Sequence, residues 1–118
     1  MVSQQGLGTW MEEREFNALA DAMLTKIEQA LEACDADIDF ELKDGGVLEI
    51  SCESDAGSSK IIINRHTAAR EIWLAARSGG FHFRHDAGRW VGTRDGETLM
   101  AAISRCLSEQ TGEPVELA

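Results

Sequence analysis

Carboxylate side chains recur at regular spacing between residues 21 and 41, and they are the side chains of this sequence best suited to bind a cation. In the first part they fall three, four or seven residues apart, on one face of a helix, and in the second part they alternate with apolar residues, as in a half-buried strand. The helical acids are Asp21, Glu28, Glu32 and Asp35, and the strand acids are Asp37, Asp39 and Glu41. Carboxylate oxygens suit hard cations. The sequence therefore predicts a surface of oxygen ligands along these seven residues, here called the acidic ridge.

The ridge lacks the features of an enclosed metal site. Its Asp-x-Asp-x-Asp run at residues 35–39 has the spacing of a calcium-binding loop, but Phe40 stands where the sharp turn needs glycine and Gly46 where a bidentate glutamate is needed. We therefore expect any metal here to be exposed to solvent, weakly held and poorly selective. Like charges four residues apart destabilise a helix by about 0.2–0.5 kcal/mol per pair, so keeping these acids on one helix face favours a use for them. The alternative explanation, an acidic face that only keeps the protein in solution, stays open.

Other side chains with reactive chemistry do not assemble into a site. His82 and His85 lie three apart in a predicted strand and so face opposite ways, and His66 follows a strand end. We expect structural or surface roles for all three. The cysteines, without a CxxC pair, are predicted to be reduced, buried small hydrophobes of a cytosolic protein. They are Cys34, Cys52 and Cys106.

The elements that position the ridge follow from the hydrophobic pattern. A helix over residues 12–34 is followed by six short strands with glycine-containing turns between them, and a second helix covers residues 97–110, with Gly112 as its stop. The strands are expected at residues 37–43, 47–53, 60–65, 71–76, 81–84 and 89–93. A loop is expected at residues 54–58, and Val115 and Leu117 can pack as a short tail. The sequence predicts an α+β fold, a two-layer αβ sandwich whose antiparallel sheet carries the N- and C-terminal helices on one face.

Trp73 marks a second candidate surface. Its strand neighbours Ile72 and Leu74 can face the helices, so alternation places Trp73 on the open face of the sheet, together with His82 and Arg84. An exposed tryptophan among polar and basic groups suits a protein partner. The alternative, an indole covered by neighbouring side chains, stays open, and Trp90 is assigned to the core.

Charge is distributed unevenly along the 118 residues, whose net charge is −10. Residues 12–55 hold 14 acids against 3 bases, whereas residues 60–105 hold 8 bases against 4 acids. The acidic range therefore predicts a strongly negative surface patch. Such a patch repels nucleic acid and anionic membranes and attracts cations or basic protein surfaces. Residues 1–11 have neither the character of a signal peptide nor that of a transit peptide, so we expect a loose N-terminal extension, one domain over residues 12–118, and a cytoplasmic location.

Several motifs in collinear order resemble bacterial frataxin, the CyaY family. They are 45–48 (GGVL), 61–65 (IIINR), 72–75 (IWLA), 79–83 (GGFHF) and 95–98 (DGET), with Trp90 before the last. The resemblance spans residues 11–115. It implies an iron-binding protein that regulates iron–sulfur cluster assembly, with ferrous and ferric iron held weakly by surface carboxylates and no organic cofactor.

The resemblance also implies which residues carry each role. The ridge acids, with Asp21 further up the helix, would bind iron, and Glu28 and Glu32 would also dock a basic patch of the cysteine desulfurase. Asn64 and Trp73, with Arg65 nearby, would form a sheet site for the assembly complex, which includes the iron–sulfur scaffold protein. A monomer is expected, with a possible iron-dependent oligomer.

Two departures from the family pattern leave the ridge with fewer acids and a shorter turn between helix and strand. Gln29 and Ala33 stand where close relatives often carry the second acid of a pair, and only Ala36 separates Asp35 from Asp37.

Two other functions stay open. One is a ferroxidase that oxidises ferrous iron at the ridge, against which the absence of histidine ligands argues. The other is a metal-independent acidic interaction domain.

Overall fold

The computed structural model describes residues 11–117 and contains two helices, six strands and one short 3-10 helix. The helices are α1 (Glu13–Glu32) and α2 (Leu99–Thr111), and the 3-10 helix is η1 (Thr67–Ala69). The strands are β1 (Ile38–Lys43), β2 (Val47–Ser54), β3 (Gly57–His66), β4 (Glu71–Ala76), β5 (Gly79–Asp86) and β6 (Arg89–Gly92). Residues 1–10, most of the expected N-terminal extension, lie outside the described residues. Neither helix within the described part is long and apolar enough to cross a membrane.

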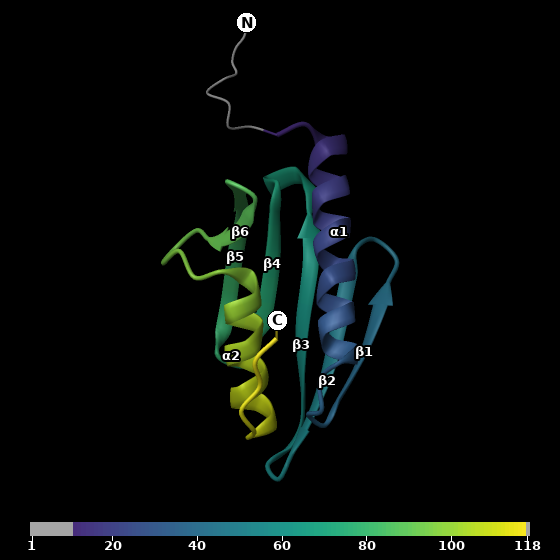
Figure 1. The fold of residues 1–118 in the computed structure, drawn as a ribbon, viewed down its shortest axis with the longest axis vertical. Coiled ribbons are helices and arrows are strands. Elements are labelled where there is room, and N and C mark those ends of the chain that lie inside the picture. Colours follow the sequence, from purple (N-terminus) through teal and green to yellow (C-terminus); the bar gives the residue numbers. More distant parts are fainter. Residues whose placement is uncertain (1–10, 118) are drawn as a thin grey trace, which may run out of the picture.

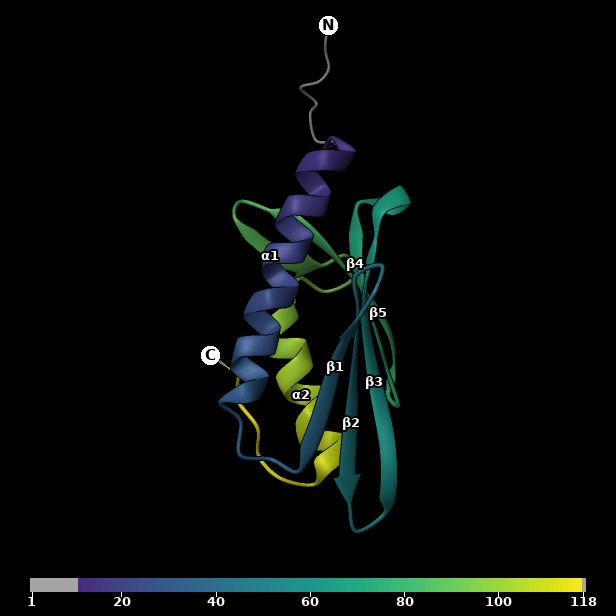
Figure 2. The same ribbon diagram turned by 90° about the vertical axis from the view of Figure 1, so that its right-hand side faces the viewer.

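The strands form one antiparallel sheet in the order β1-β2-β3-β4-β5-β6 (Figure 1). Both helices pack on the same side of this sheet and leave its other side open (Figure 2). The predicted α+β two-layer sandwich is therefore confirmed. Gly45 and Gly46 close the β1–β2 hairpin at φ 85° and 75°, a backbone conformation that glycine adopts without steric cost.

Several predicted boundaries are wrong, for local reasons. α1 stops at Glu32, because the Cys34 amide bonds to the Leu31 carbonyl and tightens the last turn, so Asp35 lies in the following loop. The loop expected at residues 54–58 is a two-residue turn, since Ser54 pairs directly with Gly57 and extends both strands. η1 was not expected. α2 begins at Leu99, with the Thr98 hydroxyl accepting from the Ala101 amide, and ends at Thr111, with Gly112 as the predicted stop.

The apolar sides of both layers meet in one core. It is built from buried residues of both helices and of strands β2 to β6, and Trp90 lies in it, packed edge-on against Phe16. The C-terminal tail closes this core, because Leu117 is 8% exposed and its amide donates to the Ser104 hydroxyl. The Ser108 hydroxyl donates to the Val115 carbonyl and accepts from the Val115 amide. The predicted packing of the tail is confirmed.

Two of the three cysteines lie in the core. Cys52 and Cys106 are fully buried, Cys34 is half-buried, and all three are free. Burial raises the pKa of the Cys52 and Cys106 thiols above the usual thiol range. A raised folded-state pKa favours the folded protein below the ordinary thiol pKa, and this contribution is lost as the pH rises through the folded value.

A thiol reagent should therefore distinguish the cysteines. In the native protein at pH 8 one thiol, that of Cys34, should react quickly, and the other two should react only after unfolding in denaturant. The measurement is a timed titration with a chromogenic disulfide reagent. Cys34→Ser should abolish the fast phase. Rapid reaction of all three thiols in the native protein would contradict this assignment of the core.

Candidate functional site

The helical half of the acidic ridge lies on the solvent side of α1. The opposite side of this helix is buried in the core, and its buried residues are Phe16, Ala20, Leu24, Ile27 and Leu31. Their packing turns Glu28 and Glu32 away from the core, and Glu28 is half-buried whereas Glu32 is exposed. The position of these carboxylates is thus fixed by the apolar stripe and not by contacts of their own.

The C-terminal end of α1 is negatively charged and lacks compensation. The first turn holds Glu13 and Glu15 at the positive end of the helix dipole, but no basic residue occupies the last turn. Glu32 and the exposed Asp35 therefore lie at the negative end, where each carboxylate is unfavourable by about 0.3–1 kcal/mol. A cation or a basic surface that binds here relieves this repulsion.

The strand half of the ridge lies at the same edge of the molecule but on another face. In the β1–β2 register, Ile38 and Phe40 pair with buried residues of β2, so they face the helices. Asp39 and Glu41, both exposed, therefore project from the open face of the sheet. The sequence pattern predicts that helix and strand acids adjoin one another, whereas the structure places them in two layers, joined by the loop that holds Asp35 and Asp37.

Lysines balance the upper part of the strand half. Glu41 pairs across the ladder with Glu49, whose carboxylate lies 3.2 Å from the Lys60 ammonium and 3.4 Å from that of Lys43. The hydrogen bond from Lys60, with a further one from Lys43, lowers the pKa of Glu49. The uncompensated negative charge is consequently concentrated below Glu41, around the end of α1 and the start of β1.

Asp21 is already paired. The Arg65 guanidinium approaches its carboxylate to 2.5 Å between Nη1 and Oδ1. Within the part of the chain that the structure describes, Asp21 is the one ridge acid in an ion pair. Arg65 can reach it because Gly46 leaves room: a Cβ atom at Gly46 would lie 2.9 Å from Arg65 Nε. Asp21 is therefore the ridge acid least available to a cation.

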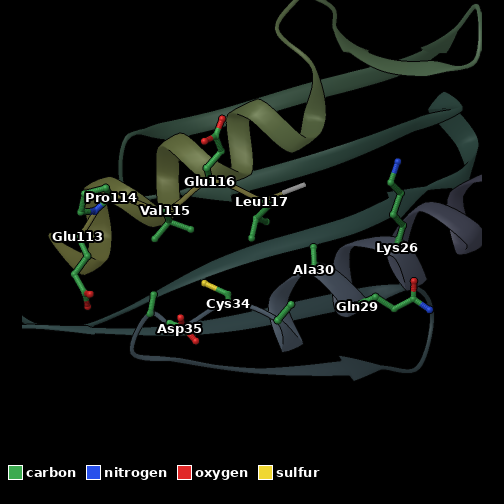
Figure 3. A pocket seen from close by; sticks show the side chains of 12 residues that line it. Lys26, Gln29, Ala30, Cys34, Asp35, Glu113, Pro114, Val115, Glu116 and Leu117 are labelled. Carbon is green, nitrogen blue, oxygen red and sulfur yellow. The ribbon is translucent and has the colours of Figure 1, made fainter.

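A groove beside the end of α1 extends the acidic surface. It has a volume of about 700 Å³ and separates the α1–β1 loop from the C-terminal tail (Figure 3). Cys34 and Asp35 line it from the loop, and Glu113 and Glu116 line it from the tail. Sequence reasoning did not place the tail acids near the ridge, because the antiparallel return of the tail between the helices decides their position.

The ridge acids do not converge on a point. Within residues 11–117, no group of three or more His, Cys, Asp or Glu side chains lies close enough together to hold a metal ion. The arrangement can therefore attract cations through its field and hold them through one or two exposed carboxylates. It does not enclose them.

The predicted sheet site is divided between two faces. Asn64 and Trp73 are cross-strand partners on the open face, as predicted. Arg65 pairs across the ladder with the buried Ile72, so it faces the helix layer, where it meets Asp21. The grouping of Arg65 with Trp73 is therefore wrong, since neighbouring residues of a strand face opposite ways.

Trp73 is half-buried, and its ring is covered on both sides. The His66 ring stacks on it with centroids 3.8 Å apart and the His82 ring with centroids 4.3 Å apart. The indole Nε1 donates to Glu71 Oε1 at 2.8 Å. Sequence reasoning missed Glu71 and His66 as members of this site, although each lies two residues from a predicted member, on the same face of its strand. His85 packs against Trp90 on the other face of the sheet, which confirms the prediction that His82 and His85 face opposite ways.

The chain is similar to proteins of one family over most of its length. A family model described as a frataxin-like domain matches residues 9–113. The iron-sulfur cluster assembly protein CyaY of Dechloromonas aromatica is 57% identical over 107 residues, which cover 91% of this chain and 99% of that protein. The protein of the same name from Ralstonia nicotianae is 49% identical, covering 89% and 93%.

Solved structures agree with these matches. The frataxin of Psychromonas ingrahamii superimposes with a TM-score of 0.79 at 31% identity, covering 92% of this chain and 99% of its own. Trimeric frataxin of the yeast Saccharomyces cerevisiae, complexed with ferrous iron, superimposes with a TM-score of 0.58 at 28% identity, covering 95% and 100%.

The unfavourable charge at the end of α1 can be measured in the absence of metal. Replacing Glu28, Glu32 and Asp35 by Gln, Gln and Asn should raise the free energy of unfolding by roughly 1 kcal/mol, because repulsion among the acids and with the helix dipole is removed. The melting temperature should rise by about 3–6 °C in low salt. The matched control is Glu13→Gln with Glu15→Gln at the favourable end of the same helix, which should lower the melting temperature. A triple variant no more stable than the wild type would show that the ridge is not self-repelling.

Proposed function

The chain belongs to the frataxin-like domain family, and from this premise we propose that it acts in iron–sulfur cluster assembly as an iron-binding regulator that docks on the cysteine desulfurase. Its CyaY relatives carry iron–sulfur cluster assembly in their names. The iron site and the desulfurase contact are both assigned to the acidic ridge. All three cysteines are free, which suits action in the cytoplasm, where thiols stay reduced.

The observation that carries the proposal is the uncompensated negative end of α1. A folded chain maintains the repulsion among Glu28, Glu32 and Asp35 at a cost in stability, without a basic residue in the last turn of the helix. Asp37 and Asp39 add further exposed carboxylates directly after it. A positively charged ligand that binds at this end removes the repulsion, and the relief of repulsion favours binding.

Iron fits this donor set as a weakly held ligand. Exposed carboxylate oxygens are suitable for Fe2+ and Fe3+, whereas firm and selective binding needs several donors at a fixed geometry. The ridge offers such oxygens singly or in pairs, and Asp21 and Glu41 lie at its edges, beside Arg65 and beside the Glu49 ion pairs. We assign the main iron contacts to Glu28, Glu32, Asp35, Asp37 and Asp39.

The same charges would steer a protein partner. A concentrated negative patch meets a basic patch quickly, and such encounters weaken with salt because exposed charges are screened over about 8 Å at physiological ionic strength. The open sheet face around Asn64 and Trp73 is assigned to the iron–sulfur scaffold protein. Glu28 and Glu32, to which the desulfurase contact is assigned, lie on α1 in the helix layer, so one frataxin-like domain could contact both proteins at once.

Binding is favoured over catalysis at the ridge. The histidines of the described chain lie elsewhere, since His66 and His82 stack on Trp73 and His85 packs on Trp90. A ferroxidase would consume oxygen in proportion to added ferrous iron, and its activity would be lost in the Glu28, Glu32 and Asp35 variant. A metal-independent interaction domain would show no residue-specific NMR changes at the ridge on addition of iron.

The proposal predicts competition between iron and the desulfurase. One set of carboxylates cannot be fully paired twice, so each ligand should lower the affinity of the other by the same factor. Desulfurase affinity, measured by biolayer interferometry at two salt concentrations with and without anaerobic Fe2+, should fall with both salt and iron. Glu28→Lys with Glu32→Lys should weaken both interactions by about tenfold or more.

A control on the same helix separates local from global charge. Glu13→Lys with Glu15→Lys makes the same change in net charge at the far end of α1, and it should leave both affinities within about twofold of the wild type. Folding of each variant is checked by circular dichroism. A desulfurase affinity that responds neither to iron nor to the ridge variant would overturn this assignment.

A further inference from the structure

Three aromatic rings form a continuous stack across the open face of the sheet. His66 of β3, Trp73 of β4 and His82 of β5 lie with neighbouring planes within 12° and 7° of parallel. Trp73 and His82 are direct cross-strand partners, and His66 reaches Trp73 diagonally. Both faces of the indole are thus occupied by the chain itself, which leaves the edge of the ring for any partner.

A buried carboxylate fixes the orientation of this stack. Glu71 is 8% exposed, and both of its oxygens are engaged. Oε1 accepts from Trp73 Nε1 at 2.8 Å and lies 3.4 Å from His82 Nδ1, and Oε2 accepts from Arg84 Nη2 at 3.0 Å. A buried carboxylate is stable only when it is paired, so these donors hold Glu71 and Glu71 in turn holds the indole.

His66 contributes its ring face to the stack. Its Nδ1 atom is buried and has no hydrogen-bond partner among the described residues. Leaving a polar atom unpaired is unfavourable, so contact of the ring with Trp73 must compensate for it. The stack therefore uses the ring face of His66 and no hydrogen bond of its Nδ1 atom.

We propose that Glu71 is a positioning residue that, together with the two stacked imidazoles, holds Trp73 in one orientation as a preformed contact edge for an acidic segment of the scaffold protein. This inference rests on the proposed function, in which the open face contacts the assembly complex. Preformed side chains bind more tightly because they lose less conformational freedom on association. Tryptophan is also one of the side chains enriched among the residues that dominate such contacts.

The charge around the stack indicates the chemistry of the partner segment. The side chain of Arg84 is 65% exposed, so its guanidinium presents unused donors to solvent beside the indole edge, and the neighbouring His82 side chain is 46% exposed. Both acceptor oxygens of Glu71 are already used. A surface of exposed donors around an indole edge is complementary to carboxylates, whereas the acidic ridge is complementary to a basic patch. The two surfaces therefore select partners of opposite charge.

The first test needs no partner. The indole N–H resonance of Trp73, assigned by comparison with Trp73→Phe, should show slow hydrogen exchange in the wild type. Glu71→Ala should accelerate this exchange about tenfold or more and shift the resonance, because the acceptor is lost. Glu71→Gln keeps an oxygen acceptor and should restore most of the protection. Unchanged exchange in Glu71→Ala would overturn the positioning role.

The second test measures affinity for the desulfurase–scaffold complex. Trp73→Ala should weaken binding about 30-fold or more, as for a central interface tryptophan. Glu71→Ala, which keeps the indole but frees it, should weaken binding about 3- to 10-fold. Glu71→Gln and His66→Phe, which retain the acceptor and the stacked ring respectively, should stay within about threefold of the wild type. Glu53→Ala removes a carboxylate from the same sheet face outside the stack and should have no effect.

The outcomes separate this inference from the function on which it rests. If the wild type binds the complex and the ridge variants weaken binding, but Glu71→Ala and Trp73→Ala do not, the contact edge is overturned and the proposed function stands. If the wild type fails to bind at all, the proposed function falls, and the docking role of the stack falls with it. Weakened binding of Glu71→Ala that Glu71→Gln rescues, in parallel with indole protection, supports the inference.

Discussion

Burial of the apolar stripe of α1 against the sheet is the interaction on which the rest of the structure depends. The stripe fixes the rotation of the helix, and the rotation decides where every polar residue of α1 points. With Phe16, Leu24 and Leu31 in the core, the carboxylates near the end of the helix cannot avoid solvent or one another. Their mutual repulsion is small beside the burial of three large apolar side chains, each of which contributes about 1.5–3 kcal/mol. The core therefore supplies the stability with which an acidic surface can be maintained.

The sheet imposes a second constraint, because each strand offers one set of alternate residues to the helices and the other to solvent. This alternation divides the acidic ridge into a helix layer and an open-face layer, and it sends Arg65 and Asn64 to opposite sides. The helix side of β3 ends in the Arg65–Asp21 ion pair, which neutralises the upper end of the ridge. The open side of the same strand ends in His66, on the aromatic stack. One strand thus contributes a side chain to each surface, Arg65 on the helix side and His66 on the open side.

The sequence allowed the fold to be predicted well, because period-two and helical patterns are strong and the strands follow one another as simple hairpins. The face of each strand residue could also be predicted, and the misplacement of Arg65 came from grouping by sequence distance instead of parity with Ile61 and Ile63. The covering of Trp73, an alternative that the sequence left open, could not be decided in advance, because stacking by His66 depends on the diagonal register of β3 and β4 and on side-chain rotamers. The tail acids beside Asp35 were missed for a related reason. Glu113 and Glu116 reach the groove only because the chain turns at Gly112 and runs back between the helices.

Buried and exposed carboxylates have different roles in this domain. Glu71 is surrounded by donors that the fold itself provides, so its charge is satisfied internally and can hold an aromatic ring in place. Glu28, Glu32 and Asp35 have no such donors within the described chain, and their charge remains available to a ligand. A carboxylate that is paired inside the protein contributes geometry, whereas one left in solvent contributes a field that reaches about a Debye length. The acidic ridge therefore suits ligands that arrive by charge and leave easily, and the Trp73 stack suits a partner that must fit a fixed shape.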